Sequence, residues 1–244
     1  MSDKICLIRQ PAGIGDILFC KKIGITYSSL GFCVYWPIAK AIENIIPYIE
    51  TSDHIKYIPE DLSFPYSDFY YQSRPMNQPV TKTDFVYLPL QFATDHQTGL
   101  IMETKYKLAN IDRFDWVSFM GIKRNKEKEE ALYHEILGLK KGEDYTLANW
   151  TYGSYPNSVR RPFPINTGDK KIIEVTDREG FSVFDWCTVI ENAETIHMMD
   201  TCFSIIAETL TLKAKKLFLY GRYSNSYKET IYLFKKPWEL SACL

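Results

Sequence analysis

The sequence lacks an excess of either charge. Its 244 residues include 29 lysines and arginines and 30 aspartates and glutamates, so the formal net charge is −1. A chain without a global positive field has no general attraction for nucleic acid or for an anionic membrane. We therefore expect no nucleic-acid partner, and any anionic ligand must be bound by a few local groups.

Long hydrophobic runs and paired cysteines are lacking as well. No apolar stretch approaches the roughly 20 residues that span a bilayer, and residues 1–10 (MSDKICLIRQ) carry no secretory signal. The six cysteines are scattered, form no Cys-x-x-Cys pair and lie mostly in apolar segments, as reduced buried thiols do. These absences predict a soluble, cytoplasmic chain with no transmembrane segment.

Metal-binding patterns are scarce too. The sequence contains no Asp-x-Asp pair, and its four histidines are dispersed along the chain. Zinc and the hard divalent cations need several ligands at short, defined spacings. We therefore expect no metal site and no other cofactor.

What the sequence does contain is an alternation of strand and helix patterns. An apolar run at 5–8, a loop, a helical pattern and a second apolar run at 33–38 predict a β-α-β start, which implies a parallel sheet. The alternation restarts at Tyr145, after a charged helix and a linker. Because the chain exceeds a typical domain of about 100 to 150 residues, we predict an α/β fold with two domains, residues 1–138 and a smaller 139–244.

The first strand-to-helix junction carries Gly13, Gly15 and Asp16. Two glycines let the backbone turn sharply and a ligand come close, and the helix N-terminus offers free N–H groups. Asp16 could act there as a base pointing into a cleft, or it could simply cap the helix. Nicotinamide dinucleotide binding would need a third glycine near Leu18 and an acid ending the second strand, and neither is present. A phosphate P-loop is excluded because no Gly-Lys-Ser/Thr follows.

A second junction lies at the end of the apolar strand that contains His197. Asp200 and Thr201 close this strand and open a helix whose N-terminus, with the Thr201 and Ser204 hydroxyls, would suit a diphosphate. The alternative is that the Asp-Thr pair caps the helix. We interpret Cys202 as a small buried thiol and His197 as a hydrogen-bonded core residue.

Three segments, in this order, resemble the ADP-heptose lipopolysaccharide heptosyltransferase family: GIGDIL, LYHEILGL and DWCTVIENAETIHMMDTCFSIIAETL. Cys202 and Ile205 stand where that family has Gly and His, and the second half lacks a predicted helix after its first strand. The resemblance implies the GT-B fold, two Rossmann-like domains with parallel sheets and an interdomain cleft, in which Asp16 and Asp200 would face each other. The residues that match the family's motifs are Gly15, Asp16, Asp200, Thr201 and Ala207.

The resemblance also gives a role to the loop at 151–164 (TYGSYPNSVRRPFP). By its place in the order, Arg160 or Arg161 matches a basic residue that pairs with the donor diphosphate, for which guanidinium groups are well suited. A solvated basic turn is the alternative. Glu174 and Glu208 could each bind a ribose hydroxyl, or could simply lie in solvent.

The function implied by the resemblance is an inverting, metal-independent transfer of a sugar from a nucleoside diphosphate sugar to a hydroxyl of a glycan or other acceptor. Asp16 would take the proton of the acceptor as the bond forms. The alternatives are a non-catalytic nucleotide-sugar-binding or interaction protein with a degenerate GT-B shell, and a nicotinamide oxidoreductase. The expected donor-binding residues are Gly13, Gly15, Arg160, Arg161, Asp200, Thr201 and Ser204.

Overall fold

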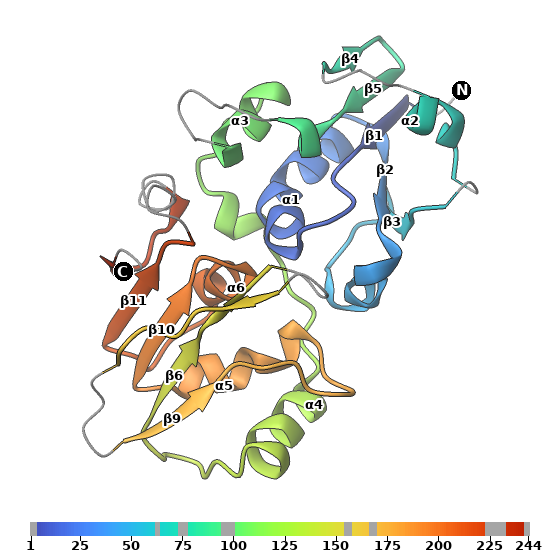
Figure 1. The fold of residues 1–244 in the computed structure, drawn as a ribbon. Helices are drawn as coiled ribbons and strands as arrows, with labels where there is room; N and C mark the ends of the chain where they lie inside the picture. The colour runs from blue at the N-terminus through green and yellow to red at the C-terminus, as the bar shows by residue number, and fades with distance from the viewer. Residues whose placement is uncertain are drawn as a thin grey trace. The chain divides into compact units, whose positions relative to one another are not determined.

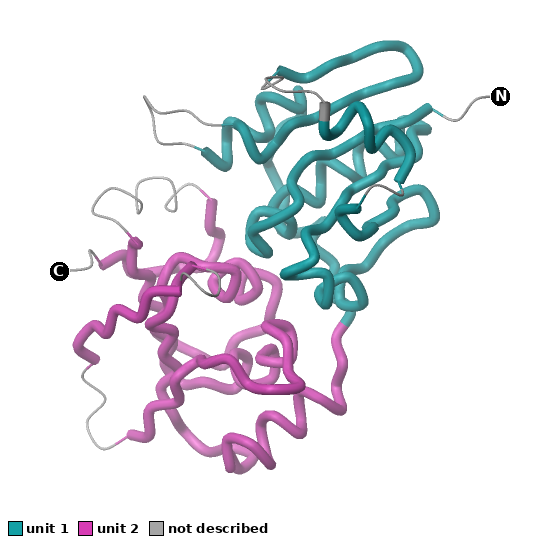
Figure 2. The backbone as a smooth tube through the Cα atoms, turned by 45° about the vertical axis from the view of Figure 1, so that its right-hand side comes forward, with its two compact units in different colours: residues 1–123 teal, residues 124–244 magenta. Residues whose placement is uncertain are grey.

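The structure, a computed structural model, describes residues 4–61, 64–72, 78–93, 101–153, 158–165, 170–222 and 233–241. They form two compact units, residues 1–123 and 124–244, which are coloured separately in Figure 2. Each unit contains a five-stranded sheet with helices packed on it (Figure 1). In the described part of the chain, no helix is long and apolar enough to cross a membrane. The prediction of an α/β fold with parallel sheets in both halves is confirmed.

The first sheet has the strand order β3-β2-β1-β5-β4. Its central strand β1 has buried side chains on both faces, as the apolar run of its sequence predicts. All neighbours pair in parallel except β4 and β5, which are antiparallel. The strands are β1 (Lys4–Ile8), β2 (Phe32–Ile38), β3 (Ile55–Pro59), β4 (Val80–Thr81) and β5 (Phe85–Leu88).

Helices cover both faces of this sheet. On one face α1 packs against β2, and α3 and η3 pack against α1. On the other face Tyr70 of α2 joins Leu7 and Tyr87 in a buried cluster. The helices are α1 (Ile14–Ser29), η1 (Lys40–Tyr48), α2 (Ser67–Gln72), η2 (Leu90–Phe92), α3 (Ile101–Leu108) and η3 (Trp116–Phe119).

The second sheet is parallel throughout and has the order β12-β11-β10-β6-β9. A separate antiparallel pair, β7 and β8, follows β6 along the chain. The carboxyl ends of parallel strands share one edge, so the residues after β6, β9, β10 and β11 lie along the same side of the unit. The strands are β6 (Tyr145–Asn149), β7 (Thr151–Tyr152), β8 (Val159–Arg160), β9 (Lys171–Glu174), β10 (Thr195–Met199), β11 (Lys216–Tyr220) and β12 (Trp238–Ser241).

The two faces of the second sheet are covered differently. The helices α4 and α6 both contact α5, so they lie on one face. On the other face the Phe163 ring stacks on Tyr220 with ring centroids 3.5 Å apart and also faces His197. Within the described residues between β6 and β9 there is a hairpin and no helix, as the sequence predicts. The helices are α4 (Lys126–Glu130), η4 (Ala131–Ile136), η5 (Val183–Trp186), α5 (Cys187–Asn192) and α6 (Cys202–Thr209).

The charged helix α4–η4 belongs to the second unit. Arg124 donates to Glu129 (Nε to Oε1, 2.7 Å) and to Glu191 of α5 (Nη1 to Oε1, 2.6 Å), and the Thr188 hydroxyl donates to Glu129 at 2.6 Å. The boundary between the units therefore falls at 123/124, whereas the linker after this helix and the restart of the strand-helix alternation at Tyr145 predict it at 138/139. An amphipathic pattern shows which face of a helix is buried, but not which partner covers it.

Candidate functional site

Asp16 lies in the first turn of α1, immediately beyond the loop that follows β1. Gly13 is the N-cap of this helix, with φ of 80°, and the cap has no side-chain hydrogen bond. The Asp16 carboxylate pairs instead with Lys105 Nζ of α3. Asp16 is thus not the N-cap residue, and its side chain points to an ammonium group that is distant in sequence.

Lys105 is the centre of a small buried network that the sequence did not reveal. Its side chain is 4% exposed, while that of Asp16 is 35% exposed. Lys105 Nζ also donates to Gln10 Oε1 at 2.6 Å, and Gln10 Nε2 donates to the Ala12 carbonyl at 2.6 Å. The buried ammonium is therefore held by two acceptors, Gln10 and Asp16, while the carboxylate keeps access to solvent.

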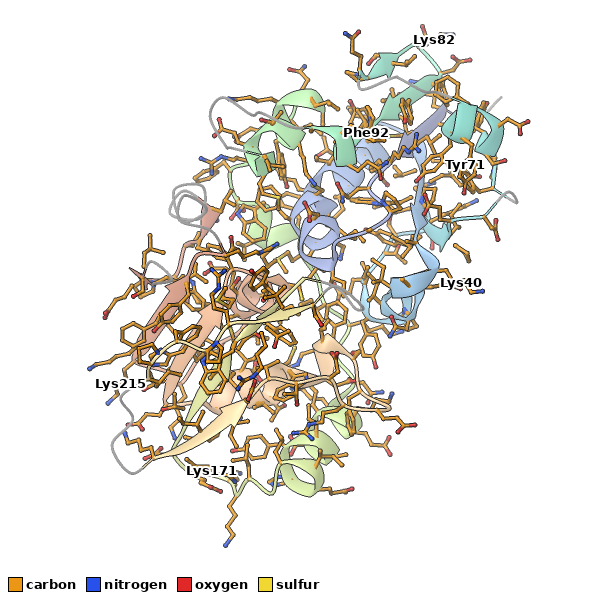
Figure 3. The ribbon with its side chains drawn as sticks, in the orientation of Figure 1. Lys40, Tyr71, Lys82, Phe92, Lys171 and Lys215 are labelled. Carbon is orange, nitrogen blue, oxygen red and sulfur yellow. The ribbon has the colours of Figure 1, made fainter. Side chains whose placement is uncertain are left out.

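A second cation lies at the same edge of the first sheet. The Arg9 guanidinium, directly after β1, lies 4.5 Å from the Tyr70 ring centroid and 5.0 Å from that of Phe92, which is labelled in Figure 3. Arg9 Nη1 donates to the Tyr70 carbonyl at 2.9 Å. Its Nε is buried and has no hydrogen-bond partner within the described residues. Arg9 thus adds positive charge near the loop that carries Gly13.

Thr201 and Ser204 form a capping box at the start of α6. Thr201 Oγ1 accepts from Phe203 N at 3.3 Å and from Asn149 Nδ2 at 2.9 Å. Ser204 Oγ, which is fully buried, accepts from Thr201 N at 3.2 Å and donates to the Thr201 carbonyl at 2.7 Å. Both hydroxyls therefore cap the helix, and a contact with a diphosphate would require these hydrogen bonds to be exchanged.

Asp200, Arg161 and Arg222 come together at the carboxyl edge of the second sheet. Asp200 N donates to the Tyr220 carbonyl at 2.9 Å, and its own carbonyl accepts from Arg222 Nε. The exposed Arg161 donates from Nη1 to the Arg222 carbonyl at 3.2 Å. Arg222 was missed in the sequence, although its position directly after the apolar strand KKLFLY places it at this edge.

Arg160, Glu174 and Glu208, for which the resemblance suggests donor-binding roles, already form contacts within the second unit. Arg160 forms a two-pronged ion pair with Glu174, with Nε–Oε1 and Nη2–Oε2 distances of 2.7 and 3.0 Å. Glu208 is buried and accepts from Lys235 N at 2.8 Å and from Trp238 Nε1 at 2.7 Å. The interpretation of Glu208 as a solvated group is therefore wrong, because Glu208 is buried and anchors β12 to α6, whereas Glu174 lies in a solvent-exposed ion pair with Arg160.

His197 and Cys202 have the surroundings expected of core residues. His197 Nδ1 lies 2.9 Å from the Tyr220 hydroxyl, and its ring stacks on Phe218 with centroids 4.4 Å apart. Burial lowers the pKa of His197 to about 4, so the imidazole is neutral at pH 7. Burial raises the pKa of the Cys202 thiol to about 12, which removes the thiolate that a nucleophile needs.

Two hollows of the described structure lie away from both junctions. One, of about 400 Å³, lies beside α3 and is lined by residues that include Tyr106 and Phe114. The other, of about 520 Å³, lies on the face of the second sheet that Phe163 covers, with His197 and Phe218 among its lining residues. Neither Asp16 nor Asp200 lines either hollow.

Two Rossmann-like units with parallel sheets define a GT-B-like fold, and solved glycosyltransferases share it. A glycosyl transferase family 9 protein from Veillonella parvula matches with a TM-score of 0.54 at 10% identity, over 98% of this chain and 86% of its own. The iron-containing dodecameric glycosyltransferase TibC from enterotoxigenic E. coli matches with a TM-score of 0.51 at 11% identity, over 98% of this chain and 62% of its own. This chain therefore covers less than two thirds of TibC.

The heptosyltransferase WaaC of E. coli, solved with ADP, also matches, with a TM-score of 0.43 at 10% identity, over 97% of this chain and 90% of its own. No protein-family model and no curated protein sequence matches the chain. The distant resemblance to heptosyltransferases that the motifs indicate is confirmed, and it establishes the fold.

Proposed function

We propose that this chain is a glycosyltransferase that moves a sugar from a nucleoside diphosphate sugar to an acceptor hydroxyl, with inversion and without a metal ion. The donor would bind the second unit at the junction that carries Asp200, and the acceptor would bind the first unit at the junction that carries Asp16. The GT-B-like fold supports the reaction class, and the residues at the two junctions support the assignment of roles.

The position of Asp16 is the observation that carries the proposal. Its carboxylate lies at the carboxyl edge of the first sheet, is 35% exposed and is held by a buried lysine. In an inverting transfer the acceptor oxygen attacks the anomeric carbon, the bond from that carbon to the diphosphate oxygen breaks, and a base takes the hydroxyl proton. Asp16 would be that base, and the diphosphate would leave as an anion.

The leaving diphosphate would be stabilised by the carboxyl edge of the second sheet. Among the described residues, the Arg161 guanidinium donates a hydrogen bond only from Nη1, to the Arg222 carbonyl, so its other donors could reach phosphate oxygens, as could the N-terminus of α6 next to Asp200. Arg160 would contribute only after releasing Glu174. Gly13 and Gly15 would let the ligand approach the loop of the first unit closely.

The test begins with a thermal-shift screen of UDP-, GDP-, ADP- and CMP-sugars, since a ligand that binds only the folded state raises stability. Transfer from the donor that binds is then measured for Asp16→Asn. We expect turnover to fall by about 10² to 10⁴ while donor affinity stays unchanged, because an amide cannot accept the proton. Asp53→Asn, at an exposed position of the same unit, is the matched control. A parental rate for Asp16→Asn would remove Asp16 as the base.

A second function, non-catalytic nucleotide-sugar binding, is favoured by the internal hydrogen bonds of the donor side. The Thr201 and Ser204 hydroxyls cap α6, and Arg160 is paired with Glu174. Such a site would bind a donor weakly and without chemistry. Donor binding by calorimetry, together with neither hydrolysis nor transfer over a broad acceptor panel, would support this function over the first.

A further inference from the structure

Lys105 is a buried cation whose side-chain partners, within the part of the chain that the structure describes, belong to the first junction. Its Nζ donates to Gln10 Oε1 at 2.6 Å and pairs with Asp16 Oδ1, and the side chain is 4% exposed. Burying an ammonium group is costly unless it is paired and hydrogen-bonded. An apolar residue could fill this position of α3 without that cost, so packing alone does not account for a charge here.

The network around Lys105 links the loop to the carboxylate. Gln10 Nε2 donates to the Ala12 carbonyl at 2.6 Å, and the Gln10 carbonyl accepts from Trp36 Nε1 at 2.9 Å. The hydrogen bond to the loop thus orients the Gln10 side chain, which in turn positions the Lys105 ammonium. The ammonium then restrains the Asp16 carboxylate. Since Lys105 contacts Oδ1, Oδ2 is the oxygen left for another partner.

We propose that Lys105 is a positioning residue for Asp16, which directs the carboxylate toward the acceptor hydroxyl. This inference rests on the proposed function, in which Asp16 is the base. The ammonium holds one oxygen of the carboxylate and is itself held by Gln10, so the orientation of Asp16 is restrained. Contact through one oxygen also restricts the directions in which the other can accept a proton, and such orientation is a large part of catalysis by a base.

One further titratable group faces this pair from α1. The Cys20 thiol feels both the Lys105 and the Asp16 charge, and its burial raises its pKa to about 12, so it stays neutral across the working range. Among the described residues, the change in charge near Asp16 on removal of Lys105 therefore comes from Lys105 itself.

The experiment compares Lys105→Gln, which keeps a donor for Gln10 but removes the charge, with Lys105→Arg, which restores it. Lys107→Gln is the matched control, because Lys107 lies on the same helix, is 68% exposed and pairs with Glu103. For Lys105→Gln we expect kcat to fall at least about tenfold with donor KM changed by less than about twofold. Lys105→Arg should recover most of the activity, because it restores a cation beside the carboxylate.

An unchanged kcat in Lys105→Gln, or a loss confined to donor KM, would overturn the positioning role. A wild-type chain that transfers no sugar from any donor in the screen would instead contradict the proposed function. In that case thermal unfolding can still test whether Lys105 interacts with Asp16. Lys105→Gln should lower the unfolding midpoint less in an Asp16→Asn background than in the parent. Additive shifts would show that Lys105 does not act on Asp16.

Discussion

Asp16 Oδ2 lies 2.5 Å from the point that a Cβ atom on Gly13 would occupy. Real Cβ atoms do not approach an oxygen so closely, so a side chain at position 13 would displace the carboxylate. Gly13 also has φ of 80°, a conformation that costs other residues strain. Glycine at this position is therefore required both by the backbone and by the placement of Asp16.

Gly13→Ala should separate these two requirements when it is compared with Gly31→Ala. Gly31 has φ of 84° and nothing within 4 Å of its would-be Cβ, so it shares the backbone strain but not the collision. We expect both variants to lose about 1 kcal/mol of stability, measured by denaturant unfolding. Only Gly13→Ala should also lower the transfer rate, by about tenfold or more. Equal rates in the two variants would show that the collision is relieved without moving Asp16.

The two neighbouring arginines should differ in their effect on donor binding. Arg161→Ala combined with Asp200→Ala should weaken donor affinity at least about tenfold, or about 1.4 kcal/mol, because both residues lie at the edge next to α6. Arg160→Ala should have a smaller effect, since Arg160 is already paired with Glu174. Calorimetric titration of each folded variant measures this, and an equal or larger loss in Arg160→Ala would reverse the assignment.

Arg124→Ala should destabilise the second unit strongly. It leaves the fully buried Glu129 carboxylate without its main partner, and breaking a buried ion pair typically costs about 3 to 5 kcal/mol. Burial alone would raise the pKa of Glu129, but hydrogen bonds from Arg124 and Thr188 hold it below its ordinary value. In the parent, the ionised Glu129 therefore contributes its stabilisation in full above the pKa that Glu129 has in the unfolded chain. This contribution is lost as pH falls through the lower pKa of Glu129 in the folded chain.

The same substitution should reverse this pH dependence. Without Arg124 the remaining effect of burial raises the pKa of Glu129, so Arg124→Ala should gain stability relative to the parent as the solution is acidified. Thermal midpoints between pH 7 and pH 4 measure the difference. Lys126→Ala is the control, because Lys126 is 60% exposed and also contacts Glu129; it should leave the parental pH dependence nearly intact.

His197 should cause a second loss of stability in mild acid. Its pKa is about 4 in the folded chain, compared with about 6.5 in an unfolded one. Between these values the unfolded chain binds more protons, so stability falls as pH drops from 6.5 to 4. His197→Gln should remove most of this slope, whereas His54→Gln, at an exposed position, should not. A parental slope in His197→Gln would assign the effect to other groups.

Most strands of the two sheets could be predicted from the sequence, because buried parallel strands have largely apolar sequences such as KICLI and KLFLY. The helix α3 was missed because its sequence, IMETKYKL, combines charged residues with a weak apolar face. The role of Lys105, which lies in α3, could not be predicted either, because no local sequence pattern links it to Asp16 across 89 residues. The short edge strand β12 was not predicted for a related reason. It is held by a hydrogen bond from Trp238 to the buried Glu208 and not by a run of apolar residues.

The contiguous course of the two units bears on how the chain is made. Among the described residues, all strands of the first sheet lie before residue 124 and all strands of the second lie after it. The N-terminal sheet can therefore form on the ribosome while the rest of the chain is still being synthesised. Its strands need no partner from the later part of the chain. For recombinant work the second half should be started at Arg124. A fragment that began at residue 139 would lack the guanidinium that neutralises Glu191.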